Sequence, residues 1–215
     1  MIQNIISDPI QTIFAIIALI MAISIHEYAH AWTAYYLGDP TPKIQGRITI
    51  NTIKHRDPFG TIFLLLAGFG WGKPVMTHPN NYKNPSRDYV ITSFAGPFAN
   101  LIMAAITSLP TTIALALGYN IEKIAALQFT ETVYYLNLLL FTFNLLPIYP
   151  LDGSKLIMYF IKKPSTMKLF ITSGPIILLI ILLLHRQIPI LSWIFITVNM
   201  IFAYILRGLP LTLLT

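Results

Sequence analysis

Three ionisable side chains interrupt an apolar stretch near the start of the chain. His26, Glu27 and His30 lie towards the end of Ile16–Leu37, whose other residues are mostly apolar. In an α-helix, two residues that are four apart face the same side, so both imidazoles can bind one Zn²⁺ while the glutamate reaches the metal-bound water. The alternative is a chance match of polar residues between helices. A charged group inside a membrane segment costs roughly 2.5–3.5 kcal/mol, which favours the metal interpretation.

The composition indicates a membrane protein with several spans. The chain has 215 residues, of which 55% are hydrophobic and 10% are charged, whereas a soluble domain carries about 25% charged residues. It has no cysteine, which excludes disulfides and thiolate metal ligands. The net charge of +6 does not indicate nucleic-acid binding, because the basic residues stand in short loops between apolar runs. We therefore expect a single integral-membrane domain over residues 1–215.

Five apolar runs are long enough to cross a bilayer. They are Pro9–Leu37, Asp88–Leu117, Leu127–Leu146, Met167–Leu184 and Ile188–Leu206. Between the first two, Thr41–Pro58 alternates isoleucines with polar residues, which predicts a short β-hairpin at the membrane surface. Phe59–Trp71 is apolar over only 13 residues, which is typical of a re-entrant element. The sequence predicts an all-α polytopic membrane protein with about five transmembrane helices, a re-entrant element and this hairpin.

The distribution of basic residues supports the re-entrant interpretation. If Phe59–Trp71 enters and leaves on one side, the lysines and arginines divide 12 to 2 between the two faces, and only Lys123 and Arg186 lie apart. If the segment spans the bilayer, the division is 8 to 6. Because positive charge accumulates on the cytoplasmic side, the first topology is favoured. It places the N-terminus outside, the C-terminus with Arg207 in the cytoplasm, and the histidines near the cytoplasmic side of the plasma membrane.

Two histidines leave a catalytic zinc site incomplete, because such a site usually has three protein ligands and an open position for water. The remaining candidates on the cytoplasmic side are His55, Asp57, His78 and Asp152. Asp152 is favoured because it follows the irregular stretch Pro147–Pro150, where a carboxylate can fold back towards the core. Gly153 gives that turn its conformational freedom. The alternative for Asp152 is a cap on the following helix, and the alternative for His55 and Asp57 is an ordinary surface loop.

Four ordered motifs resemble a known family. HEYAHA, FGWGKPV, SFAGPFAN and NLLPIYPLDG are similar to motifs of the site-2 protease family of intramembrane zinc metalloproteases, in particular its small bacterial branch without a PDZ domain. The resemblance covers about Ile16–Leu206. It implies that His26, His30 and Asp152 bind one Zn²⁺ and that Glu27 is the catalytic acid and base.

The resemblance also concerns two asparagines and one glycine. Asn100 and Asn144 match family asparagines that hold substrate or stabilise the oxyanion. Both amides stand in apolar runs and need partners, so interhelical hydrogen bonding is an equal alternative. Gly96 and its small neighbours indicate close helix packing. Gly72 stands where the family commonly has alanine, which is a departure within the loop expected to contact substrate.

The expected function is that of an intramembrane zinc metalloendopeptidase which cleaves transmembrane helices of membrane proteins. Zinc activates a water molecule and Glu27 acts as general base. The expected partners are a transmembrane protein substrate and the lipid bilayer, without nucleic acid. The alternative is a non-proteolytic membrane metal-binding or transport protein, which would not need Glu27. Transport would also require ionisable groups along the later spans, whose interiors carry none.

Overall fold

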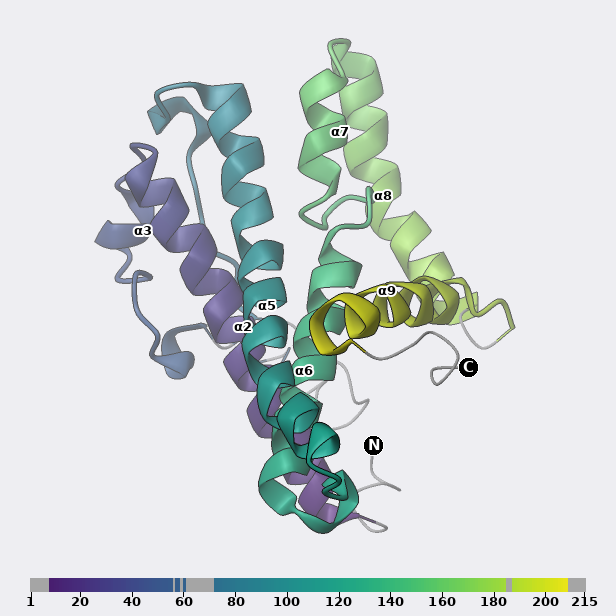
Figure 1. Ribbon diagram of the computed structural model, residues 1–215. Coiled ribbons are helices and arrows are strands. Elements are labelled where there is room, and N and C mark those ends of the chain that lie inside the picture. The colour runs from purple at the N-terminus through teal and green to yellow at the C-terminus, as the bar shows by residue number, and fades with distance from the viewer. Residues whose placement is uncertain (1–7, 56, 59, 61–71, 185–186, 209–215) are drawn as a thin grey trace.

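The computed structural model describes residues 8–55, 57, 58, 60, 72–184 and 187–208, and these are organised almost entirely as helices (Figure 1). The long helices are α2 (Pro9–Tyr36), α5 (Pro85–Ala116), α6 (Ala125–Asn144), α8 (Pro164–Leu184) and α9 (Ile190–Arg207). Shorter elements are α3 (Thr41–Ile44), α7 (Ser154–Phe160) and 3₁₀ turns at Thr52–His55, Pro79–Asn81 and Ile121–Lys123. Every predicted span coincides with one long helix to within three residues at each end.

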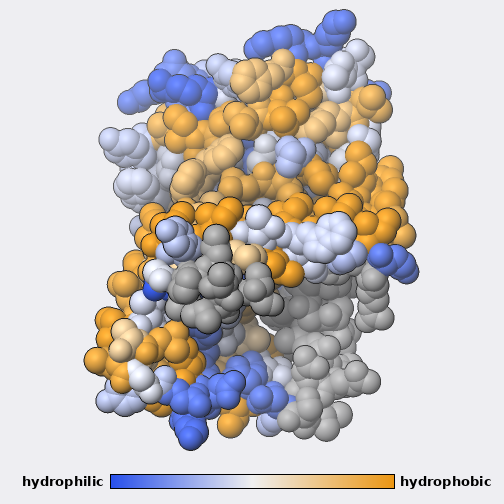
Figure 2. Space-filling model, turned by 45° about the vertical axis from the view of Figure 1, so that its right-hand side comes forward, coloured by the Kyte–Doolittle hydropathy of each residue, from blue (hydrophilic) through white to orange (hydrophobic). Residues whose placement is uncertain are grey.

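Four of the long helices have the length and hydropathy of membrane spans, namely α2, α5, α8 and α9. Helix α6 has 20 residues but is not among these four, so the structure supports a multi-pass membrane protein with one candidate span fewer than predicted. Figure 2 shows hydrophobic residues across the middle of one face and hydrophilic residues gathered at its two ends. This distribution matches the apolar interior and polar surfaces of a bilayer.

The helices α2, α5 and α6 pack against one another and form the centre of the molecule. On α2 the contacts are made by small side chains, because Ala18, Ala22, Ala31 and Ala34 are fully buried. Such residues allow close approach of helix backbones where lipid offers no hydrophobic driving force. On the other side of α6, a cluster of Ala104, Tyr134, Leu138 and Phe141 receives apolar side chains of α9.

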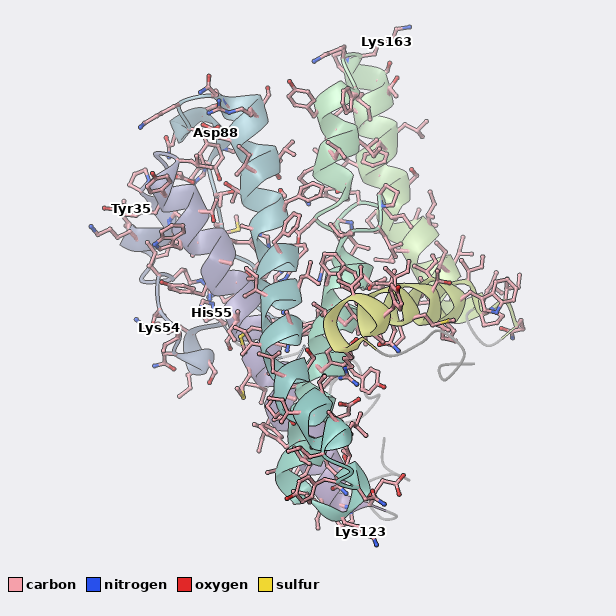
Figure 3. The ribbon with its side chains drawn as sticks, viewed as in Figure 1. Tyr35, Lys54, His55, Asp88, Lys123 and Lys163 are labelled. Carbon is pink, nitrogen blue, oxygen red and sulfur yellow. The ribbon has the colours of Figure 1, made fainter. Side chains whose placement is uncertain are left out.

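Helix α9 also contributes a buried charge. The Arg207 guanidinium forms two hydrogen bonds of 2.8 and 2.9 Å to the Glu131 carboxylate on α6 and lies 3.8 Å from the centre of the Tyr134 ring. The predicted topology placed Arg207 at the cytoplasmic end of the last span, whereas the structure pairs it with a residue in the half of α6 that follows Lys123. Figure 1 shows the reason, since α9 runs across the bundle rather than along it. Lys163 and Lys123 lie at opposite ends of the molecule (Figure 3).

The predicted β-hairpin over Thr41–Pro58 is wrong for the described residues of that range, which form α3, a 3₁₀ turn and irregular chain. The physical reason is Arg47, whose side chain is buried. It binds backbone carbonyls that would otherwise need partners such as a neighbouring strand. Its guanidinium donates to the carbonyls of Lys54, Lys73 and Pro74. The predicted re-entrant segment, residues 59–71, lies outside the described residues apart from Gly60.

Asp39 fixes the chain where α2 ends. Its carboxylate is fully buried and accepts hydrogen bonds from the backbone and hydroxyl of Thr41, the backbone of His78 and the amide of Asn81. Burial alone would raise the pKa of Asp39, but these hydrogen bonds hold that pKa below its ordinary value. The carboxylate therefore ties the end of α2 to the segment that leads into α5.

Candidate metal centre

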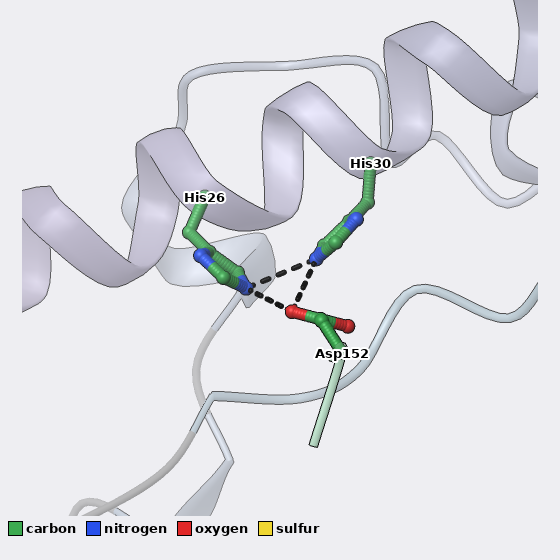
Figure 4. A group of neighbouring side chains, drawn as sticks. All are labelled: His26, His30 and Asp152. Atoms are coloured by element: carbon green, nitrogen blue, oxygen red, sulfur yellow. Dashed lines mark hydrogen bonds and ion pairs between the residues drawn. The ribbon is translucent and has the colours of Figure 1, made fainter. Parts of the chain in front are cut away.

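Three predicted ligand residues converge on one point. His26 and His30 project from the same face of α2 towards Asp152 (Figure 4). Asp152 belongs to the loop between α6 and α7. Asp152 Oδ2 lies 3.1 Å from His26 Nε2 and 3.3 Å from His30 Nε2, and the two Nε2 atoms are 2.9 Å apart. Ligand atoms of a tetrahedral zinc site, each about 2.0–2.2 Å from the metal, are ~3.3 Å from one another. The three side chains are thus arranged as three corners of such a site.

The protonation of these groups suits a cation. His30 Nδ1 lies 2.7 Å from the Thr92 carbonyl oxygen, which can only accept, so Nδ1 carries the hydrogen and a neutral ring has its Nε2 lone pair free. With both rings neutral, the carboxylate oxygen and the nitrogen lone pairs at 2.9–3.3 Å repel one another, and a bound metal cation would remove that repulsion. The donor set therefore fits Zn²⁺.

Glu27 follows His26 on α2 and contacts the extended chain after residue 72. Its Oε2 accepts a hydrogen bond of 2.9 Å from the backbone N–H of Val75. Gly72 makes this approach possible, because a Cβ there would lie 2.5 Å from Ile23 Cγ2 and 3.7 Å from Glu27 Cγ. Glycine at position 72 thus lets the chain lie against α2 beside Glu27.

Gly96 was interpreted from sequence as a helix-packing residue, and the structure gives it a more specific position. A Cβ at Gly96 would lie 2.3 Å from His30 Nε2 and 2.7 Å from His26 Nε2. This glycine therefore leaves the space on α5 that both imidazoles occupy. The signal in the sequence was the glycine inside a long helix, where a residue of low helix propensity needs a local reason.

The loop that carries Asp152 is held by close packing. Gly153 has φ −57° and ψ −24°, so it does not use the conformational freedom expected of it. Glycine is required instead because a Cβ would lie 2.2 Å from the Leu145 carbonyl oxygen at the end of α6. On the other side, Gly174 of α8 leaves room for the backbone of Tyr149. Helix α7 has no side-chain cap, so Asp152 does not fill the capping role considered as its alternative.

Lys155 adds polar contacts to the same loop. Its Nζ donates to the carbonyl oxygens of Pro150 at 2.8 Å and Leu151 at 3.3 Å, and it lies over the Tyr149 ring. Burial lowers the pKa of Lys155, and the neighbouring Asp152 opposes this shift. The lysine was not singled out from the sequence, because its contacts depend on how the loop folds.

The two asparagines predicted to contact substrate have other partners. Asn100 is fully buried, and its Oδ1 lies 2.7 Å from His26 Nδ1. Both of its amide hydrogens are used, by the Ala22 carbonyl at 3.0 Å and Asn137 Oδ1 at 2.8 Å, so it has no donor left for an oxyanion. The Asn144 amide donates to the Leu140 carbonyl one turn earlier in α6.

The other candidate ligands do not join this cluster. His55 is buried and bonds the Thr49 carbonyl oxygen, His78 contributes its backbone N–H to the Asp39 carboxylate, and Asp57 Oδ1 accepts from the backbone of Gly60. Within the part of the chain that the structure describes, one group of three His or acidic residues could hold a metal ion, and it consists of His26, His30 and Asp152.

Comparisons with known proteins identify the family of the chain. The model of "Peptidase family M50" matches residues 14–117 and 108–184. "Putative zinc metalloprotease YwhC" of Bacillus subtilis is 46% identical over 149 residues, which are 67% of this chain and 67% of that protein. "Putative zinc metalloprotease Rip2" of Mycolicibacterium smegmatis is 32% identical over 66% of this chain, and the match spans 54% of that relative. No solved structure matches the chain. The chain belongs to peptidase family M50, the site-2 protease family of zinc metalloproteases.

Proposed function

We propose that the protein is an intramembrane endopeptidase that cleaves peptide bonds within transmembrane segments of other membrane proteins. One zinc ion per chain would be held by His26, His30 and Asp152. The observation that carries this proposal is the convergence of these three ligand atoms inside a bundle of apolar helices. A metal-transport function receives no comparable support. Transport would need further ligand groups along a path through the bundle, and the described residues contain no second cluster of this kind.

The chemistry divides between the metal and Glu27. Bound zinc lowers the pKa of a coordinated water to about 7 and polarises the carbonyl of the substrate. Glu27 takes the proton of the attacking water at a carboxylate oxygen and later delivers it to the leaving amine nitrogen. The Val75 N–H, which is bonded to Glu27 Oε2, holds the carboxylate in a defined orientation for this transfer.

The extended segment after residue 72 is suited to align a substrate. Its carbonyls at Lys73 and Pro74 are fixed by Arg47, and its N–H at Val75 is fixed by Glu27, while the side chain of Met76 is exposed. A helical peptide bond is shielded by its own hydrogen bonds, so a substrate has to unwind before cleavage. Because these backbone groups are already paired within the chain, we infer that the unwound strand lies beside Met76, beyond the part that Arg47 and Glu27 hold in place.

The proposed location is the plasma membrane, with the site near the cytoplasmic side and the N-terminus outside. The expected cytoplasmic C-terminus is not part of this proposal, because Arg207 pairs with Glu131 in the half of α6 that follows Lys123. Support comes from Asp88 and Lys163, which lie at the end of the molecule opposite Lys123 (Figure 3). The metal ligands on α2 are in its second half, towards the end that carries most of the basic loops.

The direct test measures cleavage and metal content together. Purified protein is expected to retain about one zinc per chain and to cleave a transmembrane substrate in lipid vesicles. Glu27→Gln should keep the zinc and lose cleavage by about 10²–10⁴-fold, the usual contribution of a general base. Glu122→Gln is the matched control, because Glu122 is an exposed acid in the 3₁₀ turn before α6. Undiminished cleavage by Glu27→Gln would refute the mechanism.

A further inference from the structure

We propose that Asn137 is a positioning residue that fixes, through Asn100, the ring of His26 towards the metal. This inference rests on the proposed function. Asn137 lies on α6 and its side chain is fully buried. An uncharged amide inside a packed membrane bundle is costly unless it is satisfied. Asn137 bonds one backbone carbonyl of its own helix, and its other side-chain contact leads through Asn100 towards the metal centre.

The hydrogen bonds fix the orientation of each amide in turn. Asn137 Nδ2 lies 2.9 Å from the Val133 carbonyl oxygen, which can only accept, so the other atom of this amide, Oδ1, faces Asn100. Asn100 Nδ2 lies 2.8 Å from that oxygen and 3.0 Å from the Ala22 carbonyl, and it donates one hydrogen to each. Asn100 therefore presents its own oxygen to the next residue in the series, His26.

The series ends on the ligand nitrogen. Asn100 Oδ1 lies 2.7 Å from His26 Nδ1, so that Nδ1 must carry the hydrogen. In a neutral ring the lone pair is then on Nε2, which faces Asp152 and His30. The tautomer of His26 is thus set by two buried amides, one on α5 and one on α6, in a role that a carboxylate or carbonyl often plays for metal-bound histidine.

The two histidines differ in what holds them. His30 Nδ1 bonds the Thr92 carbonyl oxygen, which can only accept a hydrogen bond. His26 depends on an amide that could turn over and present NH₂ instead of oxygen. In the turned amide of Asn100, its oxygen would face two acceptors, the Ala22 carbonyl and Asn137 Oδ1. The repulsion between the turned Asn100 oxygen and Asn137 Oδ1 is one of these two unfavourable contacts. Removing the Asn137 amide therefore weakens the preference for the metal-binding tautomer of His26.

The experiment measures zinc affinity by competition with a chromophoric chelator, with no substrate present. Asn137→Leu keeps the side-chain shape and should weaken zinc binding by about tenfold, the lower end of the effect of outer residues on metal sites. Asn100→Leu should weaken it more, and Asn100→Leu/Asn137→Leu should equal Asn100→Leu, because Asn137 acts only through Asn100. Thr142→Val is the matched control on α6, since Thr142 is buried and also bonds the carbonyl one turn earlier.

A conservative variant guards against misfolding. Asn137→Asp retains an oxygen towards Asn100, and its protonated form also donates to the Val133 carbonyl, so it should bind zinc within about threefold of wild type. An affinity of Asn137→Leu equal to wild type, or a double variant that loses the product of both single effects, overturns the inference. Wild-type protein that binds no zinc refutes the proposed function itself, which separates the two failures.

Discussion

Adding one methyl group at Gly96 should empty the metal centre while leaving the fold in place. Gly96 lies on α5 directly opposite the two imidazoles of α2, where a Cβ would be 2.3 Å from His30 Nε2 and 2.7 Å from His26 Nε2. Ordinary van der Waals contact begins near 3.4 Å. The Gly96→Ala methyl group is therefore too close by 3.4 − 2.3 = 1.1 Å to one ring and by 3.4 − 2.7 = 0.7 Å to the other.

The magnitude follows from the tolerance of a zinc site. Metal–ligand distances hold within about 0.2 Å, so a displacement of about 1 Å exceeds the tolerance several-fold. Either the rings rotate out of the cluster or α5 moves away from α2. We expect zinc affinity to fall by at least about 100-fold, or about 2.7 kcal/mol. Metal-free stability should change much less, because overpacking costs about 1–3 kcal/mol while alanine gains roughly 0.5–1 kcal/mol over glycine in a helix.

Two measurements separate these effects. Zinc affinity is obtained by chelator competition, and thermal unfolding is followed in detergent with excess chelator. In the background of His30→Ala, which removes the nearest ring, Gly96→Ala should destabilise the metal-free protein less than it does in wild type. Zinc binding by Gly96→Ala as tight as that of wild type would refute the placement of this glycine against the ligands.

Three further variants test the elements around the site. Glu131→Gln leaves the buried Arg207 guanidinium unpaired and should cost about 3–5 kcal/mol in thermal unfolding. Glu131→Gln/Arg207→Met should recover most of that loss, and no recovery would contradict the pairing. The depressed pKa of Asp39 means that its stabilisation is complete above its unfolded pKa of about 3.9 and is lost as pH falls through its lower folded pKa. Unfolding measured from neutral to strongly acidic pH should therefore show an acid loss that is smaller in Asp39→Asn, and equal acid loss in both proteins would argue against this role. Lys155→Met should weaken zinc binding by about tenfold. Lys162→Met is the control, because it removes a similar carbonyl contact on an exposed turn and should leave zinc binding unchanged. Equal effects of the two substitutions would exclude a specific role for Lys155.

The parts of the molecule that the sequence predicted depend on local patterns. Two histidines four residues apart share a helix face whatever the rest of the chain does, so His26 and His30 needed no tertiary information. The long helices followed from hydropathy, which is equally local. Asp152 required one further step, because its place in the site depends on a loop that folds back, and the irregular Pro147–Pro150 stretch indicated that step.

The parts that the sequence did not predict depend on contacts between distant segments. The alternation of isoleucines before residue 58 suggested a hairpin, but Ile44 and Ile50 are 81% and 75% exposed, so no second layer selects a strand. Arg47 instead binds carbonyls up to 27 residues away, which no local pattern announces. The role of Asn137 is similar, because it acts on a histidine only through an amide on another helix.

The three ligands therefore differ in how strongly the surrounding structure fixes their positions. Those on α2 are placed by helix geometry and by the packed core of α2, α5 and α6. Asp152 is placed by its neighbours, with Gly153 against the end of α6 and Tyr149 against Gly174 of α8. Only 6% of the apolar window of α8 is buried, so this helix is the least constrained of these supports. A displacement of α8 would move the aspartate and leave the histidines in position, so that the third ligand, rather than the paired histidines, links the metal centre to a helix with little buried surface.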